Sequence, residues 1–338
     1  MKRYEKVMPK VNCHTCTVRQ EHNGQIPYAI EKNLSLDNTL IMDRTFERAR
    51  TFIFRNARPL DAARFSFLFE NGPKESVLRC LEYYQNPDGG FGHALEIDCW
   101  NPNSSPMQTW AAANIIRELG IASHPIIDGI ISYLESKADF SGSLWYKSLA
   151  SNKEYPHAPW WETDVDTTGG DDYNPSASLA GFLVRYAPEG SDAHSLGLRI
   201  SEKAEKALLD GSLPHQMNIV DFDEMREDLE IKGVPVGRLT KALSPIITEM
   251  IEHDTSLWGK EYVDMPSWHI QDSASPWIEP NREIAEAERE FLIKTQLDDG
   301  SWPITWAWND YPEQWAITKN WWKSDRIIRN LRFIRAMS

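Results

Sequence analysis

Three side chains that could move a proton follow a glycine-rich turn in the segment FGHALEIDCW (91–100). His93, Glu96 and Asp98 are separated by three and by two residues, so a helical turn or a short loop can direct two of them at one space. A carboxylate pair with a histidine suits acid–base chemistry on a sugar or a carbocation. We predict these three as candidate catalytic residues, and a polar network that holds a corner of the fold is the alternative.

Tryptophan is the compositional outlier, with 14 residues in a chain of 338. It concentrates in PWW (159–161), in PSWHIQDSASPWIEP (266–280) and near the end of the sequence, over residues 301–326. Large aromatics either fill a core or line a pocket, where they pack a hydrocarbon, stabilise a cation or stack on a sugar. Both uses stay open. If these residues line a pocket, its predicted substrate-binding side chains are Trp160, Trp161, Trp277, Trp306 and Trp308.

Helical periodicity dominates the sequence around these candidates. Apolar residues recur at three- and four-residue spacing in the segments 43–57, 105–120, 174–187, 237–253 and 282–296, and Ser, Asp or Asn stands near their starts. Strand-like alternation is scarce, and no glycine/serine linker or block of charge divides the chain. We therefore predict an all-α protein with a single domain over residues 1–338.

A polar turn that ends in a bulky residue recurs along the chain. Its variants are QEHNGQIPY (20–28), QNPDGGFGH (85–93), DFSGSLWYK (139–147), LLDGSLPHQ (208–216), EHDTSLWGK (252–260) and QLDDGSWPI (296–304). The segment between each turn and the next has room for two helices and their loops. Helix pairs that cannot bury their apolar faces alone close into a ring, so the repeats predict an (α/α)6 toroid, a barrel of six helical hairpins. Glycines accept positive φ, which favours a structural corner over a catalytic loop at QNPDGGF.

Two of these turns resemble motifs of a known superfamily. QLDDGSW (296–302) is similar to the QW repeat of squalene-hopene and oxidosqualene cyclases, and QNPDGGF (85–91) resembles the related turn of those cyclases and of protein prenyltransferase β-subunits. The resemblance extends over most of the chain through the six turns, but only these two copies are close. It implies the α/α toroid of the terpenoid cyclases and prenyltransferases more strongly than it implies an activity. The prenyltransferase zinc motif, Asp-x-Cys, is not matched, because Asp98 and Cys99 are adjacent.

A second acidic motif lies before a predicted helix. The sequence DVDTT (164–168) resembles the Asp-x-Asp-Thr-Thr motif of some bacterial drimenyl-type cyclases. That resemblance implies Asp166 as the proton donor and Asp164 as its helper, in a dry pocket that keeps a carboxyl neutral. A competing register lays DYNP (172–175) over the family motif, with Asn174 where the donor belongs. Ordinary loop and capping chemistry is the third interpretation of both registers.

Metal and cofactor signals are weak. The acidic segment DFDEMREDLE (221–230) lacks the Asp-Asp-x-x-Asp spacing that holds Mg²⁺ on a diphosphate, and we predict a solvated helix face there. Cys13 and Cys16 form one C-x-x-C pair, but Cys80 and Cys99 do not supply the second pair of a zinc site. We expect ordinary thiols, no metal and no cofactor. The sequence has no phosphate loop or dinucleotide fingerprint.

Charge and hydropathy exclude two classes of partner. The sequence has 50 acidic and 36 basic residues, a formal charge of -14 and a pI of about 5.2, so it would repel a phosphate backbone. We expect no nucleic-acid partner. No apolar run approaches the roughly 20 residues of a membrane span, and the start MKRYEKVMPKVNCHTC lacks the apolar centre of a signal peptide. These features predict a cytoplasmic protein without stable membrane insertion.

The sequence and the resemblance together predict a toroid with an axial pocket lined by tryptophans and acids. The expected activity is that of a class II isoprenoid (terpene) cyclase, which protonates a small hydrophobic prenyl or polyprenyl substrate. Asp166 and Asp164 are the first candidates, followed by His93, Glu96 and Asp98. A carbohydrate-active barrel would instead show two carboxyls roughly 5 to 10 Å apart across a tryptophan platform. A non-catalytic binding ring would show a shallow cavity and no raised carboxyl pKa.

Overall fold

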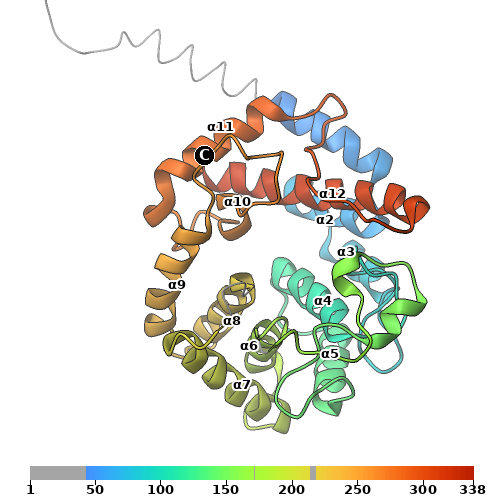
Figure 1. The fold of residues 1–338 in the computed structure, drawn as a ribbon, viewed down its shortest axis with the longest axis vertical. Coiled ribbons are helices and arrows are strands. Elements are labelled where there is room, and N and C mark those ends of the chain that lie inside the picture. Colours follow the sequence, from blue (N-terminus) through green and yellow to red (C-terminus); the bar gives the residue numbers. More distant parts are fainter. Residues whose placement is uncertain (1–42, 171, 214–217) are drawn as a thin grey trace, which may run out of the picture. The chain divides into compact units, whose positions relative to one another are not determined.

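A computed structural model describes residues 43–170, 172–213 and 218–338. Over these residues the chain is all-helical, and β-type pairing is confined to isolated bridges such as that between Gln85 and Phe91 (Figure 1). The predicted all-α class is therefore confirmed. Cys13, Cys16 and the predicted turn at 20–28 lie outside the described residues. Residues Asp43–Ser338 form one compact unit.

The segments with helical periodicity are helices, with ends that differ from the prediction by a few residues. Residues 43–56 are helical and precede the labelled elements. The longer helices are α2 (Pro59–Glu70), α3 (Lys74–Glu82), α4 (Pro106–Leu119), α5 (Pro125–Ser136), α6 (Ser176–Tyr186), α7 (Asp192–Leu209), α8 (Ile219–Ile231), α9 (Gly237–Met250), α11 (Arg282–Thr295) and α12 (Pro312–Ala336). Short turns occur at η1 (Ala150–Glu154), η2 (Pro159–Trp161), α10 (Pro266–His269) and η3 (Glu279–Asn281). None of the described helices has the length and apolarity that a membrane crossing needs.

Local capping sets the bounds of α4, the helix that carries the candidate site. Ser105 accepts a hydrogen bond from the Gln108 N–H, and Pro106 occupies the first turn, where its missing N–H costs nothing. Gly120 ends the helix in the left-handed conformation, with a φ of 58°. The loop before α4 is therefore held at a fixed point relative to the helix.

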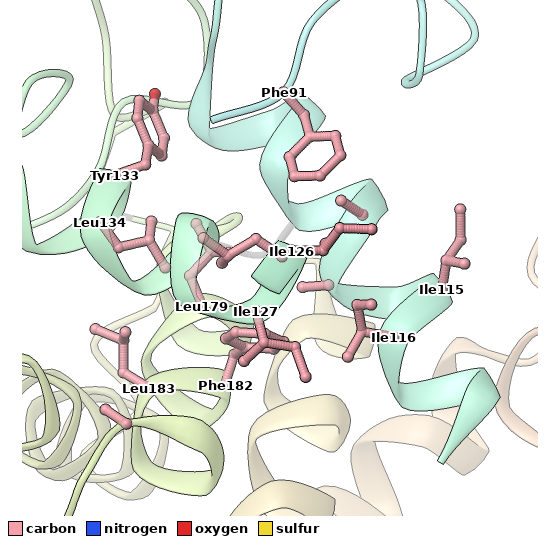
Figure 2. Close-up of a cluster of buried hydrophobic side chains, with 14 of the residues drawn as sticks. Phe91, Ile115, Ile116, Ile126, Ile127, Tyr133, Leu134, Leu179, Phe182 and Leu183 are labelled. Carbon is pink, nitrogen blue, oxygen red and sulfur yellow. The ribbon is translucent and has the colours of Figure 1, made fainter. Parts of the chain in front are cut away.

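Apolar side chains of three consecutive helices form one core. Figure 2 shows Ile116 of α4 on the side of α5 and α6, toward Ile127 and Phe182, with Phe91 from the preceding turn above α4. Phe91, Ile116 and Phe182 are completely buried. Each such side chain contributes about 1.5–3 kcal/mol through removal from water, so this core fixes α4 against α5 and α6.

The two turns that resemble QW repeats tie neighbouring helices together with the same hydrogen bonds. Gln85 Nε2 donates to Gly89 O at 3.0 Å and to Ile126 O in α5 at 3.2 Å. Gln296 Nε2 donates to Gly300 O at 2.9 Å and to Thr45 O at 2.9 Å, in the helix at 43–56. In each turn the aspartate accepts a hydrogen bond from the backbone N–H two residues later. Gln85 thus joins its turn to α5, and Gln296 joins its turn back to the helix at 43–56.

Glycine is required in both turns because the backbones approach closely. Gly89 and Gly300 have φ values of 89° and 91°, and a Cβ there would lie 2.2 Å from Gly129 O and 2.1 Å from Arg48 O respectively. Phe91 and Trp302, the aromatics that end the turns, are at most 1% exposed. The predicted structural corner at QNPDGGF is confirmed. The turns at 139–147 and 208–216 resemble the motif less closely. Cβ atoms added at Gly142 or Gly211 would meet nothing within 4 Å, so close approach does not require glycine there.

Several helices contact the next helix along the chain, including α2 with α3, α4 with α5 and α6 with α7, and α12 contacts α2 (Figure 1). Ion pairs link α2, α4, α6, α8 and α12. Arg64 of α2 pairs with Glu118 of α4 at 2.9 Å and with Asp325 of α12 at 3.2 Å. Arg117 of α4 and Arg185 of α6 both pair with Asp228 of α8, at 2.7 and 3.1 Å. Opposite charges therefore occupy space between these helices.

Candidate active site

The loop from Gly92 to Asn101 is clamped by hydrogen bonds on both sides. His93 N–H donates to Asn101 O at 3.0 Å, which closes the loop. Gln108 of α4 accepts from Glu96 N–H at 2.8 Å and donates to Cys99 O at 2.9 Å. Ala158 N–H donates to Asp98 O at 2.8 Å from the opposite side. These bonds fix the directions of the Glu96 and Asp98 side chains.

Asp98 is held by two tryptophans from the end of the sequence. Its Oδ1 accepts hydrogen bonds from Trp308 Nε1 at 2.8 Å and from Trp322 Nε1 at 2.6 Å. Trp308 lies in the connection before α12 and Trp322 within α12. The residue is only 2% exposed, and burial raises the pKa of Asp98 to about 6, while the two indole donors oppose the rise.

Glu96 lies beside Asp98 and is 8% exposed. Its Oε2 accepts a hydrogen bond from the Asp98 N–H at 3.1 Å. Burial raises the pKa of Glu96 well above its usual value, and the nearby Asp98 carboxylate raises it further. The indole donors stabilise the charged form of Asp98, so of the two carboxyls Glu96 is the one whose protonated form is favoured.

Aromatic rings surround this pair. Trp100 stacks on Trp321 with ring centres 5.3 Å apart, and Trp306 meets Trp322 edge-on at 5.2 Å. An apolar cluster beside them is formed by Cys99, Met107, Ala158, Trp161 and Trp308, with Trp100, Trp110, Tyr311 and Trp315 packed against it. Rings of this kind remove water from the carboxyls and present negative faces that attract a cation.

His93 is not part of this pair. Its side chain is exposed, and Nε2 lies 3.0 Å from Asn86 Oδ1 in the preceding turn. The residue has a φ of 61°, so it turns the chain at the corner while the loop continues inward. Of the three candidates in this segment, the structure brings Glu96 and Asp98 together and directs His93 elsewhere.

Asp164 and Asp166 lie in a different environment. Both are exposed, and the Asp164 side chain has a relative exposure of 90%. Asp164 pairs with Lys153, whose hydrogen bond lowers the pKa of Asp164. Asp166 accepts a hydrogen bond from Ala150 N–H at 2.9 Å, at the start of η1. Neither residue has the dry surroundings that a carboxylic proton donor needs.

Asp172, the acid of the competing register DYNP, is buried and forms an ion pair. Asp172 is 4% exposed, and its Oδ2 accepts from Lys147 Nζ at 2.7 Å. Its Oδ1 accepts from Asn174 N–H at 3.0 Å. The lysine neutralises the charge, and the bond to Asn174 N–H is an Asx turn within the loop before α6.

The five predicted tryptophans divide into three groups. Trp161, Trp306 and Trp308 belong to the rings around the acid pair. Trp277 is 1% exposed and donates to Asp223 Oδ2 at 2.7 Å, next to α8. Trp160 is 47% exposed. Trp321 and Trp322 lie in the tryptophan-rich segment 301–326 but, like Trp100, are not among the five predicted residues, because no local pattern pairs them with the acids.

The acidic helix α8 is not a solvated face, so that prediction is wrong for its inward side. Asp221 and Asp228 are completely buried. Glu224 accepts hydrogen bonds from Trp110 Nε1 at 2.8 Å and Asn114 Nδ2 at 2.9 Å, both on α4. The reason is that α4 and α6 supply indole, amide and guanidinium donors to this side. The apolar residues of the segment at helical spacing, Phe222, Met225 and Leu229, are the sequence signal that could have shown its burial.

Asp221 is the least satisfied acid of this helix. Within the described residues, neither of its carboxylate oxygens has a hydrogen-bond partner. Burial raises the pKa of Asp221 well above its usual value, with Glu224 and Asp172 adding to the rise. Asp221 is therefore a second carboxyl that favours the protonated form.

The described part of the chain groups no three His, Cys, Asp or Glu side chains in a way that could hold a metal ion. Comparison with known proteins gives no further assignment: no protein-family model, no curated protein and no solved structure matches this chain.

Proposed function

We propose that this protein is a protonation-initiated isoprenoid cyclase whose acid is the Glu96–Asp98 pair. One observation carries the proposal: two buried acids share one loop, where Glu96 accepts from the Asp98 N–H and Asp98 accepts from two indole N–H groups, beside a cluster of aromatic rings. A carboxyl that keeps its proton near neutral pH can protonate an alkene, which water-exposed acids cannot do. This moves the proposed donor from Asp166 to Glu96.

The proposed reaction uses each part of the site. The Glu96 O–H gives its proton to one alkene carbon, and the π electrons form the new C–H bond. The neighbouring carbon becomes a carbocation, which the ring faces around Trp308 and Trp322 stabilise. Glu96 is left as a carboxylate. Further π bonds attack the cation to close rings, and loss of a proton from the last cation to a basic group ends the sequence.

Raised carboxyl pKa values favour an enzyme over a non-catalytic ring. A glycosidase is less well supported, because Glu96 accepts a hydrogen bond from the Asp98 backbone and both acids come from one clamped loop. The predicted cytoplasmic location and lack of a nucleic-acid partner stay predictions.

We also propose the finer fold, a toroid of six helical hairpins. Three features support it: α12 contacts α2, Gln296 bonds back to Thr45, and ion pairs join α2, α4, α6, α8 and α12. An experimental structure with α2, α4, α6, α8, α10 and α12 as the inner layer would establish it, and an open arrangement of α2 and α12 would refute it.

Mass spectrometry of products tests the activity. Purified full-length protein would be incubated separately with squalene, farnesyl diphosphate and geranylgeranyl diphosphate. We expect a cyclised product from at least one substrate, and loss of that product in Glu96→Gln, which keeps the side-chain shape but has no acidic proton. A panel of oligosaccharides serves as the competing arm. Turnover of a sugar with no isoprenoid product would overturn the proposal.

A further inference from the structure

The indole N–H of Trp161 is a buried donor beside the acid pair. Trp161 is 8% exposed and packs in the apolar cluster with Cys99 and Trp308. Its Nε1 is removed from solvent, yet it has no hydrogen-bond partner in the part of the chain that the structure describes. Most buried donors are paired, so an unpaired one next to two carboxyls indicates a second state in which it finds an acceptor.

The backbone of Trp161 is tied to the acid loop. Trp161 N–H donates to Ala158 O at 3.0 Å, and Ala158 N–H donates to Asp98 O at 2.8 Å. Trp161 O accepts a hydrogen bond from Ser148 Oγ at 2.7 Å. These bonds fix η2 against the loop, so a small reorientation of side chains is enough to bring the indole N–H onto a carboxyl oxygen.

Glu96 is the acid that this indole serves. Its Oε2 accepts the Asp98 N–H at 3.1 Å. The Trp161 side chain stabilises the charged form of Glu96 and opposes the rise in its pKa, as does the positive charge of Arg58, the residue before α2. Burial and the Asp98 charge act in the opposite direction and prevail. The protonated form of Glu96 is therefore favoured, and a protonated carboxyl attracts an N–H donor less than a carboxylate does.

Asp98 shows what bonded indoles do in the same site. Its Oδ1 accepts from Trp308 and Trp322, and both donors oppose the rise in pKa that burial causes. Indole donors are thus present at both acids, bonded at Asp98 and without a regular hydrogen bond at Glu96. This difference matches one acid that carries the charge and one that carries the proton.

We propose that Trp161 is a positioning residue whose indole N–H bonds to the Glu96 carboxylate when Glu96 gives up its proton. The inference rests on the proposed cyclase function and adds the group that stabilises the spent acid. When the Glu96 O–H bond breaks, the proton forms the new C–H bond of the substrate and the electron pair stays on the Glu96 oxygen. Trp161 donates to that oxygen and keeps its own proton. Because the bond strengthens as charge develops, it favours the proton-transfer step.

Infrared spectroscopy of the full chain, without substrate, tests this assignment. The carbonyl band of the protonated Glu96 carboxyl is identified by its absence in Glu96→Gln and is followed as pH rises. Replacement of Trp161 by β-(3-benzothienyl)alanine, a tryptophan analogue with sulfur in place of the N–H, keeps the ring and removes the donor. We expect the pKa of Glu96 to rise by about 1 to 2 units.

Trp315→Phe is the matched control, since Trp315 packs against the same aromatic cluster. It removes an indole N–H that does not act on Glu96, so the pKa of Glu96 should stay where it is in the wild type. The assignment is overturned by an unchanged pKa in the benzothienyl variant. An equal rise in Trp315→Phe also overturns it, because general loosening of the cluster then accounts for the effect.

Product analysis separates this proposal from the cyclase proposal. Where a cyclised product forms, loss of the Trp161 N–H should lower kcat by up to about tenfold, leave KM unchanged and shift the basic limb of the pH–rate profile to higher pH. A raised pKa of Glu96 without any cyclised product refutes the cyclase and keeps the Trp161 assignment. A cyclised product with an unchanged pKa keeps the cyclase and refutes the assignment.

Discussion

Two loops of this protein carry a pair of acids two residues apart, and the pairs have opposite properties. Glu96 and Asp98 are 8% and 2% exposed, and burial raises the pKa of both. Asp164 and Asp166 are exposed, and the hydrogen bond from Lys153 lowers the pKa of Asp164. Identical spacing therefore does not fix whether a carboxyl holds a proton. The groups packed around a carboxyl determine whether it holds a proton.

The difference arises from which parts of the chain cover each loop. Asp98 is covered by Trp308 and Trp322, which lie 210 and 224 residues later in the sequence. Asp164 contacts Lys153, which is 11 residues away. A loop anchored by local partners stays in water, whereas a loop enclosed by a distant segment is removed from it.

The largest expected difference between the loops is in catalysis. Glu96→Gln should lower product formation by about 10²–10⁴-fold, because it removes the acidic proton. Asp166→Asn should leave the rate within about twofold, since its main contact is with the Ala150 N–H, which the amide oxygen can also accept. Steady-state product analysis of both variants measures this. A large loss in Asp166→Asn with none in Glu96→Gln would return the donor role to the exposed loop.

The second prediction compares a glycine in each loop. A Cβ at Gly92 would lie 2.1 Å from Pro102 O, whereas a Cβ at Gly170 would meet nothing within 4 Å. Gly92→Ala should therefore destabilise the protein by about 2–4 kcal/mol, since rigid backbone must move. Gly170 has a φ of 82°, and Gly170→Ala should lose only about 1 kcal/mol from backbone strain. Urea unfolding of both variants gives the difference, and equal effects would show that the Gly92 loop is not tightly enclosed.

The third prediction concerns stability as a function of pH. The pKa of Asp98 is about 6 in the folded protein and about 3.9 in an unfolded chain. The folded state therefore binds more protons between these values, and the stability that this provides is lost as pH rises through about 6. Asp98→Asn removes the buried charge, so it should stabilise the protein by up to about 3 kcal/mol above that window and have little effect near pH 4.

Urea unfolding in buffers on both sides of the window measures this pH dependence. Asp164→Asn is the matched control. Its folded pKa is lowered, so its contribution has the opposite sign and is lost as pH falls. An Asp98→Asn protein that is less stable than the wild type at neutral pH would mean that Asp98 contributes more through its hydrogen bonds than its burial costs.

Sequence reasoning predicted the helices and the two close turns because their signals are local. The periodicity of residues 105–120 and the QNPDGGF corner each lie within a short segment. It also proposed Glu96 and Asp98, but it ranked the exposed Asp164 and Asp166 above them. Exposure depends on distant residues such as Trp322, and no local pattern reports them. The wrong expectation of a solvated face for α8 has a different cause, because the spacing of Phe222, Met225 and Leu229 is a local sign of burial; only the partners of Glu224, which α4 supplies, are distant in sequence.

The smallest expected effect tests whether the distant tryptophans set the properties of the buried pair. Trp322→Phe removes one N–H donor from Asp98 and keeps an aromatic ring. Because that hydrogen bond favours the charged carboxylate, its loss should raise the pKa of the pair by about 1 unit. The basic limb of the pH–rate profile should then shift to higher pH. The difference in pKa between the buried pair and Asp164 becomes larger. Trp306→Phe is the control, since Trp306 Nε1 has no partner within the described residues and its loss leaves Asp98 unchanged. An unshifted limb in Trp322→Phe would mean that burial alone holds the proton on the pair, and that the indole contacts position the loop without tuning its acidity.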